Sequence, residues 1–189
     1  MELLSGVFSA FGLSASAGLN AYIPLLIVSL IAKFTDLINL KSPWDTLTSW
    51  WVIGAIVVLG TIEFFADKIP AVNHVNDIVQ SFVRPAAGAI VFAANADVLT
   101  DISPILSIVA GLLVAGSVHT VKSVAVRPAL TATTAGAANT PVSIAEDVIS
   151  TFLSILAVLI PIIIGIILVL AVTTFIWWRW RKANAEQAV

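Results

Sequence analysis

The sequence predicts an all-α, polytopic helical membrane protein with about five to six membrane segments. Hydrophobic residues make up 59% of the 189 residues and charged residues only 11%, and the mean hydropathy is +1.05. A water-soluble domain of this length cannot bury so large an apolar fraction. At about 20 residues for each crossing, the chain has room for little else. We therefore expect residues 1–189 to form a single integral membrane domain whose main partner is the lipid bilayer.

Charge and cysteine content exclude several classes of function. The net charge of −2 argues against nucleic acid as a partner. The chain has no cysteine, which excludes disulfides, thiolate metal sites and iron–sulfur clusters, and we expect no cofactor. Because the first basic residue is Lys33, the N-terminus lacks the basic region of a signal peptide, and we expect the first apolar stretch to be retained.

Hydropathy and turn residues divide the chain into six segments. The first is interrupted by small and polar residues between Ser14 and Pro24. The third and fifth are short: about 13 residues span about 20 Å as a helix, against a hydrocarbon core of about 30 Å, so each either crosses or re-enters. Apolar residues at helical spacing over 72–82 predict an amphipathic helix at the interface. The segments are 6–31, 50–66, 85–97, 102–121, 128–141 and 148–178, with a kink at Pro161.

Tryptophans and basic residues predict the topology. All six tryptophans lie at segment edges, where indole rings favour the headgroup region. Basic residues after the last segment indicate a cytoplasmic C-terminus in the cell (inner) membrane, and six crossings place the N-terminus on the same side. Lys33 and Lys41, which follow the first segment, favour the opposite orientation. With both termini inside, Lys122 and Arg127 face the cytoplasm, and the acidic residues that face outward are Asp97, Asp101, Glu146 and Asp147.

A short phrase occurs twice, as Val83-Arg84-Pro85-Ala86 and Val126-Arg127-Pro128-Ala129. It predicts a weak internal repeat, in which a crossing helix is followed by a cytoplasmic corner and a short helix that returns into the membrane. The alternative is two independent cytoplasmic helix starts, because proline suits the first helical position and arginine suits the inner interface.

Two breaks in apolar segments predict a polar interior site. Gly18 and Pro24 loosen the helix around Asn20 and Tyr22, and non-helical backbone at membrane depth survives only where protein or water covers it. Gly136 precedes a second such break, at Asn139. We expect Asn20, Tyr22 and Asn139 to line a substrate or ion pathway. The alternative is close helix packing by small residues, with asparagine as an interhelical hydrogen-bonding group.

Ionisable residues extend this predicted site. Glu63 and Asp67 share one helix face at i and i+4, and a charge inside the bilayer usually faces a cavity or a partner. We predict that Arg84 and Arg127 are the partners of these carboxylates. The alternative is that both acids cap a helix end in headgroup water. Glu63 and His119 are the candidate proton sites.

A metal site is a weaker hypothesis. The spacing of acidic residues and a histidine after the second segment could place them around one divalent ion, although they match no zinc signature. An interfacial position for the histidine is the more common case. The candidate ligands are Glu63, Asp67, His74 and Asp77.

Three phrases in order carry a resemblance to a known family. They are Ser16-Ala-Gly-Leu-Asn-Ala-Tyr-Ile-Pro-Leu, Glu63-Phe-Phe-Ala-Asp-Lys-Ile-Pro-Ala-Val and Arg84-Pro-Ala-Ala-Gly-Ala. Over most of residues 10–145 the chain resembles an uncharacterised bacterial integral-membrane family, domain of unknown function 4126 (DUF4126). The resemblance implies a small integral membrane protein and leaves its activity open.

Three functions remain open at this point. The leading hypothesis is a small transporter or channel for an ion or a small polar or anionic solute, with its site at broken helices. The second is a membrane-embedded, metal-dependent enzyme that acts on lipid. The third is a structural or assembly subunit of a membrane complex. A chain this small often needs a second copy to enclose a pathway, so a homodimer is a further expectation.

Overall fold

The computed structural model describes residues 2–96 and 103–186. Within these ranges, the side chains of 2, 3, 70–75, 96, 162, 168 and 183–186 are not described. Every regular element in the described part of the chain is helical, which confirms the predicted all-α fold class. In chain order the elements are α1 (Glu2–Leu19), α2 (Tyr22–Phe34), a 3₁₀ turn η1 (Trp44–Thr48), α3 (Trp50–Ala66), α4 (Pro70–Ala96), α5 (Pro104–Thr120), a π-helical turn η3 (Val121–Val126), α6 (Arg127–Thr134), α7 (Asn139–Leu159) and α8 (Pro161–Glu186).

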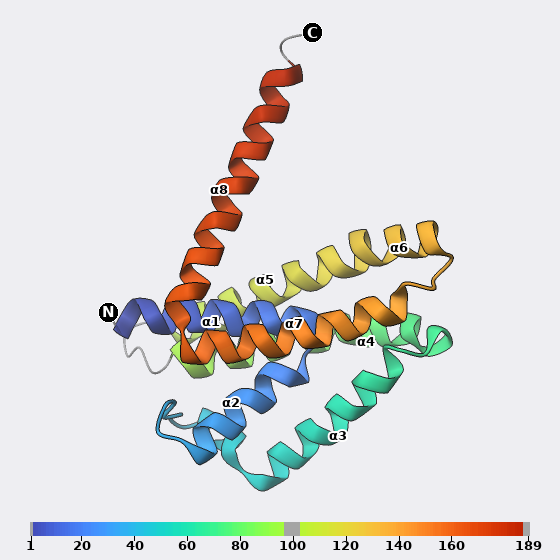
Figure 1. Ribbon diagram of the computed structural model, residues 1–189. Helices are drawn as coiled ribbons and strands as arrows, with labels where there is room; N and C mark the ends of the chain where they lie inside the picture. The colour runs from blue at the N-terminus through green and yellow to red at the C-terminus, as the bar shows by residue number, and fades with distance from the viewer. Residues whose placement is uncertain (1, 97–102, 187–189) are drawn as a thin grey trace.

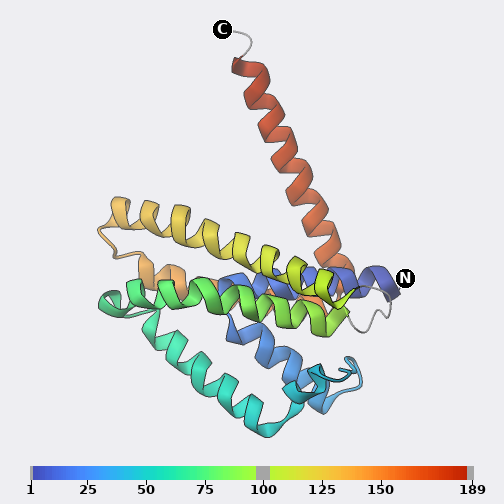
Figure 2. The same ribbon diagram turned by 180° about the vertical axis from the view of Figure 1, so that it is seen from behind.

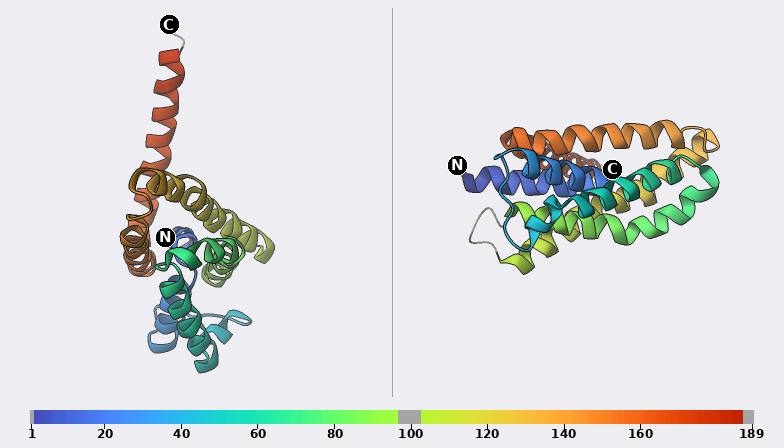
Figure 3. Two further views of the ribbon diagram at one scale, coloured as in Figure 1. Left: turned by 90° about the vertical axis from the view of Figure 1, so that its right-hand side faces the viewer. Right: turned by 90° about the horizontal axis from the view of Figure 1, so that it is seen from below.

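Helices α1, α4, α5 and α7 lie alongside one another and form the body of the protein (Figure 1). Seen from behind, α4 and the continuous α5–η3–α6 rod run next to each other (Figure 2). Helices α2 and α3 form a hairpin against one side of this body, and α8 projects away from it (Figure 3). The start of α8 still packs on α1, where a Cβ on Gly165 would lie 2.6 Å from the Phe8 ring.

Small residues bring the helices of the body close together. A Cβ on Gly111 of α5 would lie 2.7 Å from Cα of Ala89 in α4, so the two backbones are in contact there. The hydroxyl of Ser16 in α1 lies 2.7 Å from both Ser150 Oγ and Ser154 Oγ of α7. Small residues and interhelical hydroxyl bonds are the usual means of helix association in lipid, where apolar burial supplies little driving force between helices.

Four helices of the described residues are long and apolar enough to cross a membrane. Shorter apolar helices accompany them at Leu4–Leu19, Tyr22–Phe34 and Trp50–Ala66. Large apolar side chains point outward along these helices, including Leu113 at 67% exposure and Phe152 at 65%, as expected for surfaces that face lipid. The candidate spans are Asn76–Asn95, Pro104–Thr134, Asn139–Leu159 and Ile163–Lys182.

The first predicted segment, 6–31, is two helices. Helix α1 ends at Leu19, α2 begins at Tyr22, and α2 turns back from the end of α1 instead of continuing its line (Figure 1). The interruption predicted within segment 6–31 is therefore a reversal between two helices, so 6–31 is not one crossing segment. The reversal occurs at Asn20, which is not itself in a helix.

The predicted separation between 72–82 and 85–97 is also wrong. Both belong to the continuous helix α4, with Pro85 inside it. An internal proline removes one backbone hydrogen bond, but packing can offset this loss. Four of the residues just after Pro85 are buried against other helices: Ala87, Ala89, Val91 and Phe92. The end of the predicted segment, together with Asp97 and Asp101, lies outside the described residues.

The predicted short segment 128–141 divides between two helices. Residues 104–134 form one helical rod, so Arg127 and Pro128 do not begin a separate re-entrant helix. The rod ends where Ala135 (φ 50°) and Gly136 (φ 86°) adopt left-handed backbone conformations, which suit glycine. Asn139 then begins α7.

The predicted last segment, 148–178, is likewise two helices. Ile160 has an extended φ of −140° between α7 and α8, because the residue before a proline is pushed out of the helical region. Pro161 therefore separates the two helices and does not merely kink one.

Candidate functional site

A chain of hydrogen bonds links Glu63 of α3 to α4 and α5. Nε and Nη2 of Arg84 both donate to Oε1 of Glu63, at 3.2 and 2.9 Å. Each of these two side chains is 1% exposed. Nη1 of Arg84 lies 3.4 Å from Nδ1 of His119, whose Nε2 lies 3.2 Å from Ser81 Oγ. Because arginine only donates, Nδ1 of His119 accepts, and the imidazole is neutral with its proton on Nε2.

A second cluster lies one turn further along α3. Nη2 of Arg127 lies 2.8 Å from Oδ2 of Asp67 and 3.2 Å from Oε2 of Glu146. Nζ of Lys122 lies 2.7 Å from the same Glu146 oxygen and 3.7 Å from Asp67. Two acids and two bases from α3, α6, η3 and α7 thus form one buried group.

The π-helical turn η3 allows both bases to reach this group. In an α-helix, residues five apart point in different directions, whereas a π turn brings i and i+5 onto one face. The backbone N–H of Arg127 donates to the carbonyl of Lys122, five residues earlier. The turn therefore aligns Lys122 and Arg127 toward Asp67 and Glu146.

Asp67 is held as a carboxylate by its surroundings. Burial by itself would raise the pKa of Asp67, but Lys122, Arg127 and the hydroxyl of Ser143 oppose it and hold the pKa at about 2. The Ser143 hydroxyl donates to Oδ2 of Asp67 at 2.5 Å, and Asn76 Nδ2 lies 3.4 Å from Oδ1. Both oxygens of Asp67 are engaged, so Asp67 acts as a fixed charge within the bundle.

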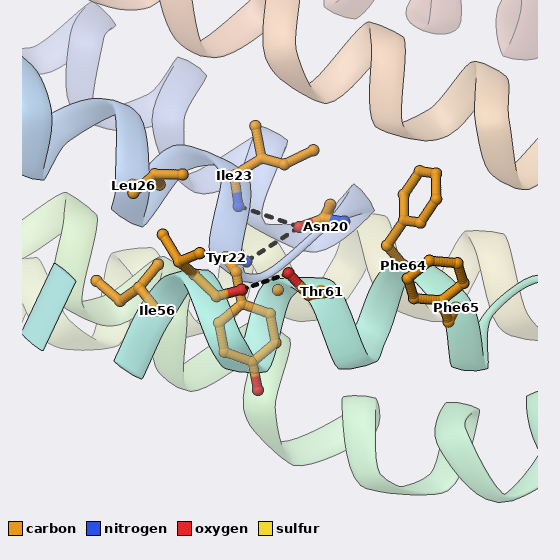
Figure 4. Close-up of a pocket in the computed structure, with 10 residues that line it drawn as sticks. Asn20, Tyr22, Ile23, Leu26, Ile56, Thr61, Phe64 and Phe65 are labelled. Atoms are coloured by element: carbon orange, nitrogen blue, oxygen red, sulfur yellow. Dashed lines mark hydrogen bonds between the residues drawn. The ribbon is translucent and has the colours of Figure 1, made fainter. Parts of the chain in front are cut away.

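Asn20 joins the helix reversal to the charged residues. Its Oδ1 accepts hydrogen bonds from the backbone N–H groups of Tyr22 and Ile23, at 3.0 and 3.1 Å, and so starts α2 (Figure 4). Its Nδ2 donates to Oδ1 of Asp147 at 2.9 Å. Oδ2 of Asp147 in turn pairs with Lys68 at 2.8 Å.

Together these groups form what we term the buried charge network. The four basic side chains are matched by four carboxylates, which come from α3, the residue after it, and α7. Buried charges require such pairing, because desolvation of an unpaired charge costs several kcal/mol. The members of the network are Glu63, Asp67, Lys68, Arg84, Lys122, Arg127, Glu146 and Asp147.

Two open, mostly apolar pockets adjoin the α1–α2 reversal. The first, of about 440 Å³, lies between α2 and α3, and its polar lining residues are Asn20, Tyr22 and Thr61 (Figure 4). Gly60 opens this region to Tyr22, since a Cβ there would lie 3.1 Å from the Tyr22 Cβ. The second cavity, of about 350 Å³, has Leu19, Lys122 and Glu146 in its lining. Leu19, the last residue of α1, and Asn20, which follows it, therefore line different pockets.

Most of the predicted site residues are brought together. Glu63, Asp67, Arg84 and Arg127 lie in the network, with His119 bonded to Arg84; Asn20 bonds to a network acid, and Tyr22 lies beside it in the first cavity. Asn139 lies apart from them: it donates to Thr131 at 3.1 Å across the α6–α7 turn.

One prediction about these charges is wrong. Lys122 and Arg127 were expected on the side of the membrane opposite to Glu146 and Asp147, yet Lys122 and Arg127 both contact Glu146. The physical reason is the position of α7, which begins at Asn139, so Glu146 lies near its start and beside the end of α5.

The sequence-based prediction of the site did not include four members of the network: Lys68, Lys122, Glu146 and Asp147. Glu146 and Asp147 interrupt an apolar run, a pattern that signals a functional or paired charge inside a membrane. No comparable signal marks Lys122, since its alignment with Arg127 depends on the π turn.

The described residues do not form a metal centre of the usual kind. No group of three or more His, Asp or Glu side chains among them is arranged to hold a metal ion. Glu63 and Asp67 are engaged with basic residues, and Asp77 lies on α4. His74 is also in α4, but its side chain lies outside the described residues.

Comparison with known proteins identifies the family. No curated protein and no solved structure matches the chain. One family model matches residues 7–181, which covers nearly all of the helices and every member of the network. The chain therefore belongs to the family described as Domain of unknown function (DUF4126).

Proposed function

We propose that this protein is a small membrane transporter for an ion or a small polar solute, with the buried charge network as part of its pathway. The observation that carries the proposal is that the network lines the second pocket directly and is joined to the first through Asn20. Asn20 lines the first and bonds to Asp147, whereas Lys122 and Glu146 line the second. A solute that moved from one cavity to the other would pass these charged groups.

The energetic character of the network supports transport over a purely packed core. Charged residues inside a membrane protein cost several kcal/mol unless paired, and they commonly mark ion or substrate pathways. The pairs in this network join α3 with α4, α3 with α6, and η3 with α7. A shift of one helix would therefore exchange ion-pair partners between defined arrangements, as alternating access requires.

The α1–α2 reversal is the element we expect to move. The reversal lies next to both pockets. Its connection between the helices consists of only two residues, Asn20 and Ala21. A short connection that absorbs backbone rotation is the usual form of a hinge. In this proposal Asn20 opens one cavity as it exchanges its bond to Asp147.

Cysteine accessibility tests the pathway, because the natural chain contains no cysteine. Thr61→Cys places a thiol in the first cavity and Ser117→Cys places one in the second. Reconstituted in vesicles, both should react with a membrane-impermeant thiol reagent. Leu113→Cys is the control: Leu113 is exposed on α5 but lines neither cavity, so lipid should protect it. Equal protection of all three thiols in folded protein would contradict an aqueous pathway.

Flux measurement then tests transport directly. Vesicles that contain the protein should take up radioactive sodium faster than protein-free vesicles. The double variant Glu63→Gln, Arg84→Met, which leaves no unpaired charge of this ion pair, should abolish the difference. If no tested ion crosses although both cavity cysteines are labelled, the cavities are water-filled without transport, and the proposal fails.

The structural alternative also has a specific observation behind it. Only 12% of the α8 span is buried within the chain, and α8 projects from the body (Figure 1). A helix with so little internal packing suits attachment to another membrane protein or to a second copy. Deletion of α8 should leave vesicle flux intact in a transporter, but should abolish co-purification of a constant partner in an assembly subunit.

A further inference from the structure

Three side-chain oxygens near the network have no hydrogen-bond donor. They are Oε2 of Glu63, Oε1 of Gln80 and Oδ1 of Asp77, and each atom is shielded from solvent. Glu63 is 2% exposed and Gln80 is 3% exposed. A buried acceptor without a donor typically costs about 1–3 kcal/mol, so three such oxygens on neighbouring helices call for a common explanation.

The register of α3 against α4 places Gln80 between two carboxylates. Arg84 contacts Glu63, and Asn76 contacts Asp67. Since Asn76, Gln80 and Arg84 are spaced four residues apart on α4, they share one helix face. Gln80 therefore lies on the face that meets α3, midway between the contacts of the two acids. By this register Gln80 lies one helical turn before Arg84, whose partner Glu63 carries another unpartnered oxygen.

Asp77 belongs to this helix face as well. It precedes Gln80 by three residues, which places the two side chains next to each other on α4. Its Oδ1 is buried without a donor, as is Oε1 of Gln80. The three unpartnered oxygens thus come from Glu63 of α3 and from two neighbouring positions of α4.

The balance of acidic and basic side chains indicates the charge of a ligand that could bind these unpartnered oxygens. The network contains four basic side chains and four acids. With Asp77 there are five carboxylates, and His119 is neutral, so the group carries one excess negative charge. Two carboxylate oxygens and one amide oxygen are hard ligands that suit alkali and alkaline-earth ions.

We propose that Glu63, Gln80 and Asp77 form a binding site for one monovalent cation of sodium size. A monovalent cation neutralises the single excess negative charge, whereas a divalent cation would leave the group with one excess positive charge. A proton on Glu63 would satisfy at most two of the three oxygens, and a metal cation can bind all three. The role of this cation as cargo or coupling ion rests on the proposed transport function, but its binding does not.

Binding can be measured on the purified full-length chain in detergent. Radioactive sodium should bind saturably, at one ion per chain, in choline chloride at constant ionic strength. Sodium should also raise the Tm, because a ligand that binds only the folded state stabilises it. Gln80→Met and Asp77→Asn should each lower sodium affinity by about tenfold or more, the loss expected for one ligand. Ser29→Ala is the matched control, since the Ser29 hydroxyl is also buried without a partner, but on α2.

Each other result has a definite meaning. Absence of sodium binding in folded protein overturns the site, as does equal affinity in the wild type and Gln80→Met. Stabilisation that follows pH instead of sodium and disappears in Glu63→Gln would assign the missing charge to a proton and overturn the metal site. Sodium binding without vesicle flux leaves the site standing and contradicts the transporter. Flux of an ion without sodium binding leaves the transporter standing and contradicts the site.

Discussion

Arg84 donates hydrogen bonds to only one carboxylate oxygen of Glu63. Two nitrogens of the guanidinium donate to Oε1, while Oε2 has no donor, although the usual arginine–carboxylate pair engages both oxygens. The third nitrogen, Nη1, is turned to His119. Arg84 therefore anchors α3 to α4 and α5 and leaves one face of the Glu63 carboxylate available to another group.

Removal of Arg84 should destabilise the protein strongly. Arg84→Met leaves the carboxylate of Glu63 buried and unpaired, which typically costs about 3–5 kcal/mol. The double variant Glu63→Gln, Arg84→Met removes both charges and should recover much of this loss. Unfolding in mixed micelles with increasing dodecyl sulfate, followed by circular dichroism, measures both. Equal stability of the single and double variants would show that the pair does not act as a unit.

Asp67 should make the protein sensitive to acid. Its pKa is about 2 in the folded protein, against an ordinary value of 3.8. Its stabilising contribution, roughly 2 kcal/mol, is therefore complete above about pH 4 and is lost as the pH falls toward 2. In Asp67→Asn this part of the pH dependence should be absent. Thermal unfolding between pH 2 and pH 6 measures the difference, and parallel curves for the two proteins would contradict it.

Close contact of α4 and α5 should be sensitive to a single methyl group. Gly111→Ala would place a Cβ 2.7 Å from Cα of Ala89, a backbone atom that cannot move alone. Overpacking of this kind costs about 1–3 kcal/mol. Gly54→Ala is the control, because its Cβ would meet no atom within 4 Å and alanine is favoured in helices by about 1 kcal/mol. Opposite changes in unfolding midpoint are expected; a similar change in both would disprove the contact.

Asn20 has two separable tasks. Asn20→Ser keeps an oxygen that can cap α2 but loses the donor to Asp147, whereas Asn20→Ala loses both. Loss of a cap costs about 0.5–2 kcal/mol, so the alanine variant should be the less stable. Asn20→Asp retains the cap but opposes Asp147 with a like charge, and it should lose stability as the pH rises through the carboxylate range. Melting curves of the three variants against pH distinguish these effects.

Local spacing and pairing rules predicted the part of the site that lies on regular helices. Glu63 and Asp67 face the same way because they are one turn apart on α3, and each meets the arginine proposed for it, Arg84 and Arg127. This prediction succeeded because a buried acid needs a basic partner and the apolar segments offer few of them.

The helix boundaries were harder to predict because proline has more than one effect. Pro161 ends a helix, whereas Pro85 lies inside α4. The difference arises from packing: the residues around Pro85 are buried between helices, and Ile160 is exposed at 47%. Tertiary contacts of this kind are not encoded in local sequence. Gly18 and Pro24 therefore predicted a break around Asn20, but neither the full reversal there nor the extent of α4 could be foreseen.

The π turn between Val121 and Val126 makes the direction of Arg127 depend on the backbone form of that stretch. Arg127 reaches Asp67 and Glu146 because one additional residue is accommodated in the turn. If this stretch relaxed to a plain α-helix with all of its residues kept, Arg127 would rotate by about 100° away from the face of Lys122. The backbone form of residues 121–126, which include Lys122, thus sets the phase between the two ends of the α5–α6 rod.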